Sequence, residues 1–358
     1  MISQEIEIGP IRPPSEGGSN SLLIRATRNC PWNRCTFCNG LSYNHEKFQL
    51  RPVEEIKKDI DTVKGVTEMI WGAARKSGHE GRLNDAVLRF IMSSTSGMMS
   101  SPTFAATYNW LASGGKTVFL QDANSLIMKT PQLIDILRHL KTTFPSIQRI
   151  TSYARSKTAL KKSIEELKAL KEAGLTRLHV GLETGDDDLL KKIKKGVTAD
   201  EHIRSGKKVV ASGIELSLYI MPGLGGLDLS SKHAKNTAGV INEINPRFIR
   251  SRPFVPRHGT SIFDEYKNGT LRLLSPHSVI MEIGMLVNDL TAHSSICFDH
   301  AMNPTYRSEN GVVALLDQSY EGYRLPDRKE EILEILNRGL SIEESRYVCA
   351  EDLIHSIL

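Results

Sequence analysis

Short apolar segments alternate with longer amphipathic segments along most of the 358-residue chain. Six apolar runs have the length and residue types of buried strands: residues 21–26, 117–121, 148–153, 176–181, 214–220 and 247–253. Between them, apolar residues recur with a helical period, which predicts helices at residues 53–76, 131–143, 159–173, 200–211 and 231–243. The long first connection also leaves room for an inserted pair of helices.

This alternation predicts an α/β fold, because parallel strands joined by right-handed helical crossovers produce such a pattern. The fold is then either an open doubly wound sheet or a full or partial barrel. From about residue 270 the alternation fades and the pattern becomes mainly helical. We therefore expect an irregular lead-in at 1–20, a barrel or sheet domain at 21–268, and an extension at 269–358 that covers it.

Composition and charge narrow the class of protein. Hydrophobic residues make up 40% and charged residues 24%, which excludes disordered, collagen-like and coiled-coil chains. The net charge of +5 permits an anionic partner, but no dense basic tract with interleaved aromatic residues indicates nucleic-acid binding. No apolar run approaches the roughly 18 residues needed to span a bilayer, and no secretory signal pattern is present. We expect a cytoplasmic protein without a membrane partner.

Three of the five cysteines lie close together in the segment CPWNRCTFC, directly after the first predicted strand. Cys30, Cys35 and Cys38 have the spacing CX4CX2C, which favours metal binding in a reducing compartment over a disulfide framework. Loops that follow parallel strands are where α/β enzymes assemble their sites. Thiolates are soft ligands that suit zinc, copper(I) and iron–sulfur clusters.

The fourth ligand distinguishes these metals. A structural zinc site requires four protein ligands, and His45 is the nearby candidate. Three cysteines without a fourth protein ligand instead describe a [4Fe-4S] cluster with one iron open to an exogenous molecule. We favour the open cluster and keep two alternatives, a zinc site and buried, inert cysteines.

The cysteine motif resembles that of the radical S-adenosylmethionine (SAM) superfamily, whose usual signature is CX3CX2C with an aromatic residue before the last cysteine. Phe37 fills the aromatic position, and the spacing here has one additional residue. The resemblance extends from about residue 20 to about residue 260. Within the superfamily, the chain resembles the branch of oxygen-independent coproporphyrinogen oxidases, methylthiotransferases and Elongator-type catalytic subunits. This resemblance implies a partial (β/α)6 TIM-like barrel.

The same resemblance implies cofactor contacts at the strand ends. After the second strand, Gln121 and Asp122 occupy the polar positions that meet the methionine amino group of SAM, with an alanine at the usual glutamate position. At the third strand, either Ser152 or Tyr153 would point at the cofactor, and Arg155 would reach an anionic group.

The fourth strand carries the closest match to that branch. Glu183 matches the residue at the strand end that contacts the cofactor, and Lys195 matches the basic residue that meets the methionine carboxylate. A carboxylate can accept hydrogen bonds from ribose hydroxyls, and an ammonium group can neutralise a carboxylate.

The last two strands supply the positions expected around the adenosine. Tyr219 and Gly223, in the segment LYIMPGLGG, would face it, because small residues let the backbone approach a ligand. Phe254 and Val255, after the sixth strand, would flank the adenine.

The resemblance implies reductive cleavage of SAM to a 5′-deoxyadenosyl radical that abstracts hydrogen from an unidentified substrate, with an electron donor such as flavodoxin or ferredoxin. Cys297, His300 and Cys349 have no assigned role, and a single cluster is expected. We expect no cobalamin-binding domain, since about twenty residues precede the first strand. The alternatives are a cluster-binding chaperone or sensor without radical turnover, and a zinc-stabilised α/β protein.

Overall fold

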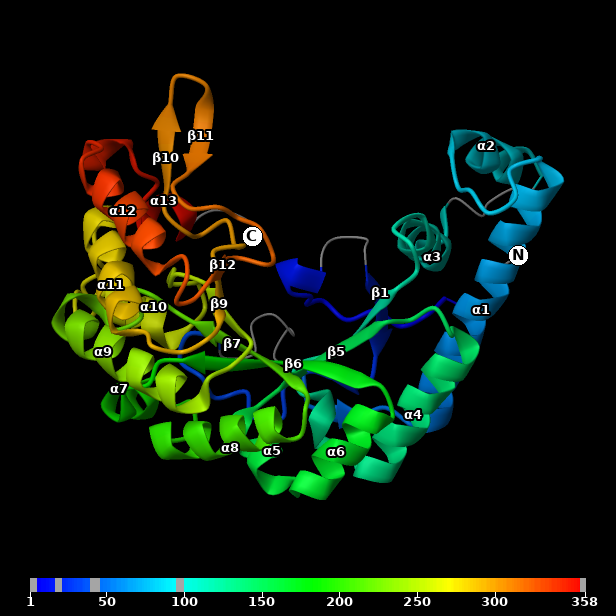
Figure 1. The fold of residues 1–358 in the computed structure, drawn as a ribbon, viewed down its shortest axis with the longest axis horizontal. Coiled ribbons are helices and arrows are strands. Elements are labelled where there is room, and N and C mark those ends of the chain that lie inside the picture. Colours follow the sequence, from blue (N-terminus) through cyan, green and yellow to red (C-terminus); the bar gives the residue numbers. More distant parts are fainter. Residues whose placement is uncertain (1–4, 17–20, 39–45, 95–99, 355–358) are drawn as a thin grey trace. The chain divides into compact units, whose positions relative to one another are not determined.

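The computed structural model describes residues 5–16, 21–38, 46–94 and 100–354 (Figure 1). These residues fall into two compact units, each assembled from several segments of the chain. The first unit comprises the described residues of Met1–Pro31, Lys47–Tyr153 and Lys168–Arg177, and the second comprises those of Trp32–Glu46, Ala154–Leu167 and Leu178–Leu358.

The first unit is built on parallel strands with helices beside them. Its strands are β1 (Ser21–Arg25), β4 (Thr117–Gln121) and β5 (Arg149–Ala154), with β4 between the other two. Its helices are α1 (Val53–Lys76), α2 (Asp85–Ser94), α3 (Pro102–Ala112) and α4 (Thr130–Thr143). A small antiparallel pair, β2 (Thr27–Arg28) and β3 (Gln49–Leu50), follows β1. Within this unit, α1 packs against α2, α3 and α4.

The second unit continues the same alternation. Its strands lie in the order β6 (Leu175–Glu183, which begins in the first unit), β7 (Glu215–Ile220), β8 (Phe248–Ser251), β9 (Ser295–Cys297) and β12 (Tyr323–Arg324). Parallel pairing joins β7, β8 and β9, whereas β12 is antiparallel to β9. The helices are α5 (Ser156–Lys161), α7 (Asp187–Lys192), α8 (Ala199–Ala211), α9 (Gly226–Ile244), α10 (Ser261–Lys267), α11 (Pro276–Asp289), α12 (Lys329–Leu340) and α13 (Ala350–Ile354). Within this unit α11 packs between α9 and α12 (Figure 1).

The predicted α/β class is confirmed. Each of the six predicted strands is present and is followed by a helix, which is the order of six βα units. The segment 159–173 forms two helices, α5 and α6 (Ile164–Glu172), because Lys162 is extended and a reciprocal capping pair of Ser163 and Glu166 begins a new helix. The inserted pair in the first connection is α2 and α3.

The region after residue 270 is mainly helical, as predicted, but it also contributes strands. Two of them, β9 and β12, extend the sheet, and β10 (Thr305–Ser308) pairs with β11 (Gly311–Ala314) in a separate hairpin. These strands were not predicted because each is four residues long or shorter, too short to show a period. In the described part of the chain, no helix has both the length and the apolar character needed to cross a membrane.

The described part of the lead-in, residues 5–16, is largely irregular and is hydrogen-bonded to the strands of the first unit. The Gln121 side chain accepts a hydrogen bond from the Gly9 amide (2.9 Å) and donates one to the Gly9 carbonyl (3.0 Å). Glu16 is 1% exposed, accepts a hydrogen bond from Arg149 (3.1 Å) and lies 4.0 Å from the guanidinium of Arg177. Residues 9–16 therefore contribute buried polar contacts to the strands of this unit.

Candidate cofactor site

The cysteine motif divides between the two units, with Cys30 in the first and Cys35 and Cys38 in the second. A turn in which the Cys38 amide donates to the Cys35 carbonyl (3.1 Å) brings the last two together, and all three side chains are half-buried. In the described residues, no group of three or more His, Cys, Asp or Glu side chains is arranged to hold a metal ion. The zinc alternative rests on His45, which lies outside the described residues. Ligation by the three cysteines therefore stays a prediction.

The turn of Cys35 and Cys38 is anchored inside the second unit. The amide of Thr36 donates to the Ile193 carbonyl (3.0 Å), and the Thr36 carbonyl accepts from the Ile262 amide (3.3 Å). Phe37 packs against a buried apolar cluster formed by Leu189, Ile193, Met221, Leu224, Phe254, Ile262 and Leu271. The aromatic position of the motif thus attaches the cysteine loop to the core of the second unit, where Phe254 also lies.

Trp32, inside the CX4C segment, fixes the segment after α7. Its indole nitrogen donates to the Lys194 carbonyl (2.8 Å), and its ring covers Gly196, where a Cβ atom would lie 2.3 Å from the ring. The Arg155 guanidinium stands 4.7 Å from the centre of the Trp32 ring and donates to the Lys195 carbonyl (2.9 Å). The backbone on both sides of Lys195 is therefore held in place.

Lys195 and Glu183 form a partly buried ion pair with 2.6 Å between Nζ and Oε1. Glu183 ends β6 with a φ of 63°, a left-handed conformation that is uncommon for residues with side chains. A Cβ atom at Gly181 would lie 2.0 Å from the Glu183 carboxylate, so glycine leaves the room that this carboxylate occupies. Burial acts to lower the pKa of Lys195, but Glu183 and the thiolate of Cys35 outweigh burial and raise it. Lys195 is therefore a cation, and its Nζ atom lies 5.7 Å from the centre of the Phe37 ring in the cysteine motif.

The remaining candidates of the second unit lie at the ends of β7 and β8. The ring of Tyr219 contacts that of His179, with 5.5 Å between ring centres. Gly223 has a φ of 84°, which favours glycine. Phe254 and Val255 are buried, and the Phe254 amide donates to the carbonyl of the proline before Gly223 (2.8 Å). The turn after β7 is thus bonded directly to the end of β8.

The candidates of the first unit all have protein partners. The Gln121 amide group binds residues 9 and 11 of the lead-in, and the Ser152 hydroxyl donates to the Leu120 carbonyl (3.2 Å). Asp122 is buried and accepts from Nε of Arg25 (2.7 Å). Burial raises the pKa of Asp122 to about 6, although Arg25 acts in the opposite direction. A cofactor role for each of these side chains stays a prediction.

Sequence analysis missed a buried charged residue in β8. Arg250 is 1% exposed and donates to Asp299 (2.6 Å), to Ser217 (3.2 Å) and to the Tyr320 carbonyl (3.2 Å). Burial acts to lower the pKa of Arg250, but Cys297 and Asp299 outweigh burial and raise it. An arginine inside an apolar strand was the signal that could have selected this site. Cys297, left without a role above, lies beside this ion pair.

The comparisons with known proteins agree with the resemblance. Residues 103–235 match the family described as the Radical SAM superfamily. The heme chaperone HemW of Bacillus subtilis (strain 168) is 31% identical over 125 residues, which cover 34% of this chain and 33% of that protein. A tRNA uridine(34) acetyltransferase of Methanocaldococcus jannaschii is 24% identical over 106 residues, covering 29% of this chain and 20% of that protein.

Among solved structures, Elp3 of the archaeon Methanocaldococcus infernus, with residues 1–46 deleted, aligns at 15% identity with a TM-score of 0.46. The alignment covers 66% of this chain and 58% of that one. The match of residues 103–235 and the similarity to the first of these relatives agree with the resemblance to the radical SAM superfamily, a family that implies SAM and an iron–sulfur cluster. The chain spans a third or less of the length of the two curated relatives.

Proposed function

We propose that the protein is a cytoplasmic radical SAM enzyme in which Cys30, Cys35 and Cys38 hold a [4Fe-4S] cluster. When bound, the cluster and SAM would supply the radical chemistry, by reductive cleavage of SAM to a 5′-deoxyadenosyl radical. The observation that chiefly supports the proposal is the partly buried pair of Glu183 and Lys195, whose ammonium lies 5.7 Å from the centre of the Phe37 ring in the cysteine motif. The match of residues 103–235 to the Radical SAM superfamily supports the same reaction class.

The donor set fits the proposed group. Three thiols on one loop are the soft ligands that an iron–sulfur cluster requires. A cluster bound by thiolates carries negative charge, and the cation of Lys195 near Phe37 of the motif complements it. Phe37, which packs against the apolar cluster, supplies apolar surface to the same loop. In this proposal, the three cysteines would be the ligands, Lys195 would balance the negative charge of the cluster, and Phe37 would supply apolar contact.

The second unit also supplies groups suited to orient a nucleoside cofactor. The carboxylate of Glu183 can accept hydrogen bonds from ribose hydroxyls, and the ammonium of Lys195 can pair with the methionine carboxylate. Gly223 lets the backbone approach closely, while Phe254 and Val255 supply apolar contact area. We assign no residue of the chain as a general base or nucleophile.

A second candidate function is a cluster-binding chaperone or sensor without radical turnover. The similarity to a heme chaperone over about a third of the chain favours it. The two functions differ in one product, because only the enzyme forms 5′-deoxyadenosine. A zinc-stabilised protein, the third candidate, would be colourless and would retain zinc.

The deciding experiment is anaerobic purification, reconstitution with iron and sulfide, and incubation with dithionite and SAM. We expect a brown protein that forms 5′-deoxyadenosine, measured by chromatography, only when the cluster is present. Reduced flavodoxin and reduced ferredoxin are then compared with dithionite, since either is proposed as the electron donor. A brown protein without product would favour the chaperone, and a colourless zinc protein would refute the cluster.

Lys195→Ala should weaken SAM binding about tenfold or more, because the partly buried ion pair loses its cation. Iron content after reconstitution should change much less. Titration of the reconstituted proteins with SAM measures the first quantity, and iron analysis the second. Lys191→Ala, an exposed lysine four positions earlier, is the control and should leave both unchanged. Equal SAM affinities for Lys195→Ala and wild type would remove Lys195 from the site.

A further inference from the structure

We propose that Glu282, in the C-terminal extension, is a positioning residue for SAM, and that together with His233 it fixes the turn after β7 and the end of β6. Both segments carry predicted SAM contacts, Gly223 and Glu183. The inference rests on the proposed function and adds that a helix outside the six βα units sets the geometry of the cofactor site.

Glu282 holds the turn after β7 directly. Its side chain is 2% exposed, and one carboxylate oxygen, Oε1, accepts a hydrogen bond from the Gly223 amide (2.6 Å). The other oxygen, Oε2, accepts from the Ser230 hydroxyl (2.5 Å) at the start of α9. A carboxylate can accept at both oxygens, and hydrogen bonds to a charged acceptor are stronger than neutral ones. The Gly223 amide is therefore held by α11.

His233 connects this turn to the end of β6. Its Nε2 atom lies 3.1 Å from the Met221 carbonyl and 3.6 Å from Glu282 Oε1. A carbonyl can only accept, so Nε2 carries the proton, and Nδ1 accepts from the Thr184 hydroxyl (2.8 Å). Burial lowers the pKa of His233 to about 4, so the ring is neutral at pH 7. Thr184 directly follows Glu183, so one imidazole binds both segments.

The two segments are also bonded to each other. The Met221 amide donates to the Glu183 carbonyl (3.0 Å), and the Gly185 amide donates to Thr237 on α9 (2.9 Å). A Cβ atom at Gly185 would lie 2.3 Å from a backbone oxygen of α9, which keeps this contact close. The turn after β7 and the end of β6 are therefore bonded directly to each other, and the end of β6 is also bonded to α9.

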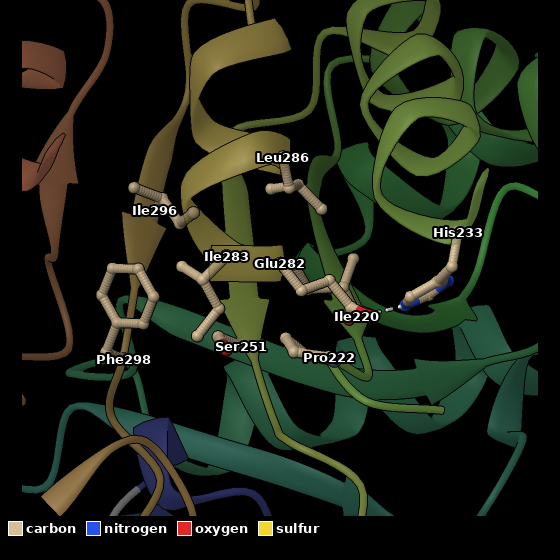
Figure 2. A pocket seen from close by; sticks show the side chains of 9 residues that line it. All are labelled: Ile220, Pro222, His233, Ser251, Glu282, Ile283, Leu286, Ile296 and Phe298. Carbon is tan, nitrogen blue, oxygen red and sulfur yellow. Dashed lines mark ion pairs between the residues drawn. The ribbon is translucent and has the colours of Figure 1, made fainter. Parts of the chain in front are cut away.

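Glu282 lies in surroundings that are mostly apolar. Figure 2 shows Glu282 and His233 beside a small cavity whose other lining residues are mostly apolar and come from β7, β8, β9 and α11. The cavity measures about 10 Å³, room for no more than one water molecule. Burial raises the pKa of Glu282 to about 7, against the hydrogen bonds from Ser230 and Gly223. Burying a carboxyl group in an apolar wall costs free energy unless hydrogen bonds compensate for the lost contact with water.

The test compares Glu282→Gln with wild type at about pH 8, above the pKa of Glu282, because glutamine keeps the volume and one acceptor oxygen but loses the charge. We expect the Kd for SAM to rise about tenfold, whereas iron content and the rate at saturating SAM stay close to wild type. Amide hydrogen exchange on the cofactor-free protein should be about tenfold faster at residues 221–226 and unchanged within β7. Glu344→Gln is the control, because this half-exposed carboxylate accepts from the His277 amide at the start of α11.

The exchange measurement separates the two proposals. If wild type neither binds SAM nor forms 5′-deoxyadenosine, the proposed function fails, while faster exchange at 221–226 still shows that Glu282 fixes this turn. Unchanged exchange and unchanged SAM affinity in Glu282→Gln would overturn the positioning role. Loss of iron with a large fall in melting temperature would also overturn it, in favour of a general structural role. Ser230→Ala, which removes the second bond to Glu282, should show the same changes more weakly, and no change would count against the proposal.

Discussion

A Cys35→Ala variant is expected to retain no cluster after reconstitution and to form no detectable 5′-deoxyadenosine. Three thiolates are the protein ligands in the proposed site, and removing one leaves too few to hold the cluster. The fold should persist, because the loop is also held by backbone bonds of Thr36 and by packing of Phe37. Iron and sulfide analysis, product chromatography and a thermal melt by circular dichroism measure these three quantities.

The matched control is Cys349→Ala, which removes the half-buried thiol just before α13. This variant should keep full cluster content and full product formation, since its thiol lies outside the cysteine motif. Retained SAM cleavage by Cys35→Ala would refute the ligand assignment. Loss of the cluster in Cys349→Ala would show that ligands outside the motif contribute.

The largest expected effect on stability comes from Asp299→Ala. We expect it to lower the free energy of unfolding by about 3–5 kcal/mol, because Arg250 would be left buried without its counter-charge. Arg250 would still donate to Ser217 and to the Tyr320 carbonyl, but both acceptors are neutral. Urea denaturation of the cofactor-free protein, followed by circular dichroism, measures the change.

A surface ion pair provides the control for that prediction. Asp228 pairs with Arg272, and both side chains are 62% exposed. Asp228→Ala should therefore cost no more than about 1 kcal/mol, because solvent screens an exposed pair. Equal losses for Asp228→Ala and Asp299→Ala would mean that burial of the Arg250 pair adds nothing to its importance.

The regular elements were predictable where their periods are long enough to detect. The predicted helix at 53–76 is α1, and the predicted strand at 117–121 is β4, with the same bounds. The strands β9 and β12 were not predictable, because three and two residues show no alternation. The secondary structure of a segment can be predicted from sequence when its own side chains determine it. It cannot be predicted in this way when hydrogen bonds to a neighbouring strand determine it.

Some residues of the candidate site were predictable from the sequence and others were not. The order of the motifs along the chain predicted that Glu183 and Lys195 belong to the site. The structure shows that they form an ion pair with each other, which the motifs do not predict. Glu282 could not be selected, because a single glutamate in an amphipathic helix usually faces solvent. Its partner Gly223 lies 59 positions earlier, and no local pattern connects the two. The cofactor contacts themselves and the boundaries at residues 20 and 268 remain predictions.

The lead-in also places a constraint on synthesis of the chain. Gly9 binds Gln121, 112 positions later, and Glu16 binds Arg149, 133 positions later, so the earliest residues find their partners only after most of β1 to β5 has been made. Such distant contacts form slowly and late. On the ribosome, the first unit can reach its final form only once Arg177 has emerged. Until then the buried site around Glu16 cannot be completed, because one of the two arginines that contact its carboxylate in the folded unit has not yet emerged.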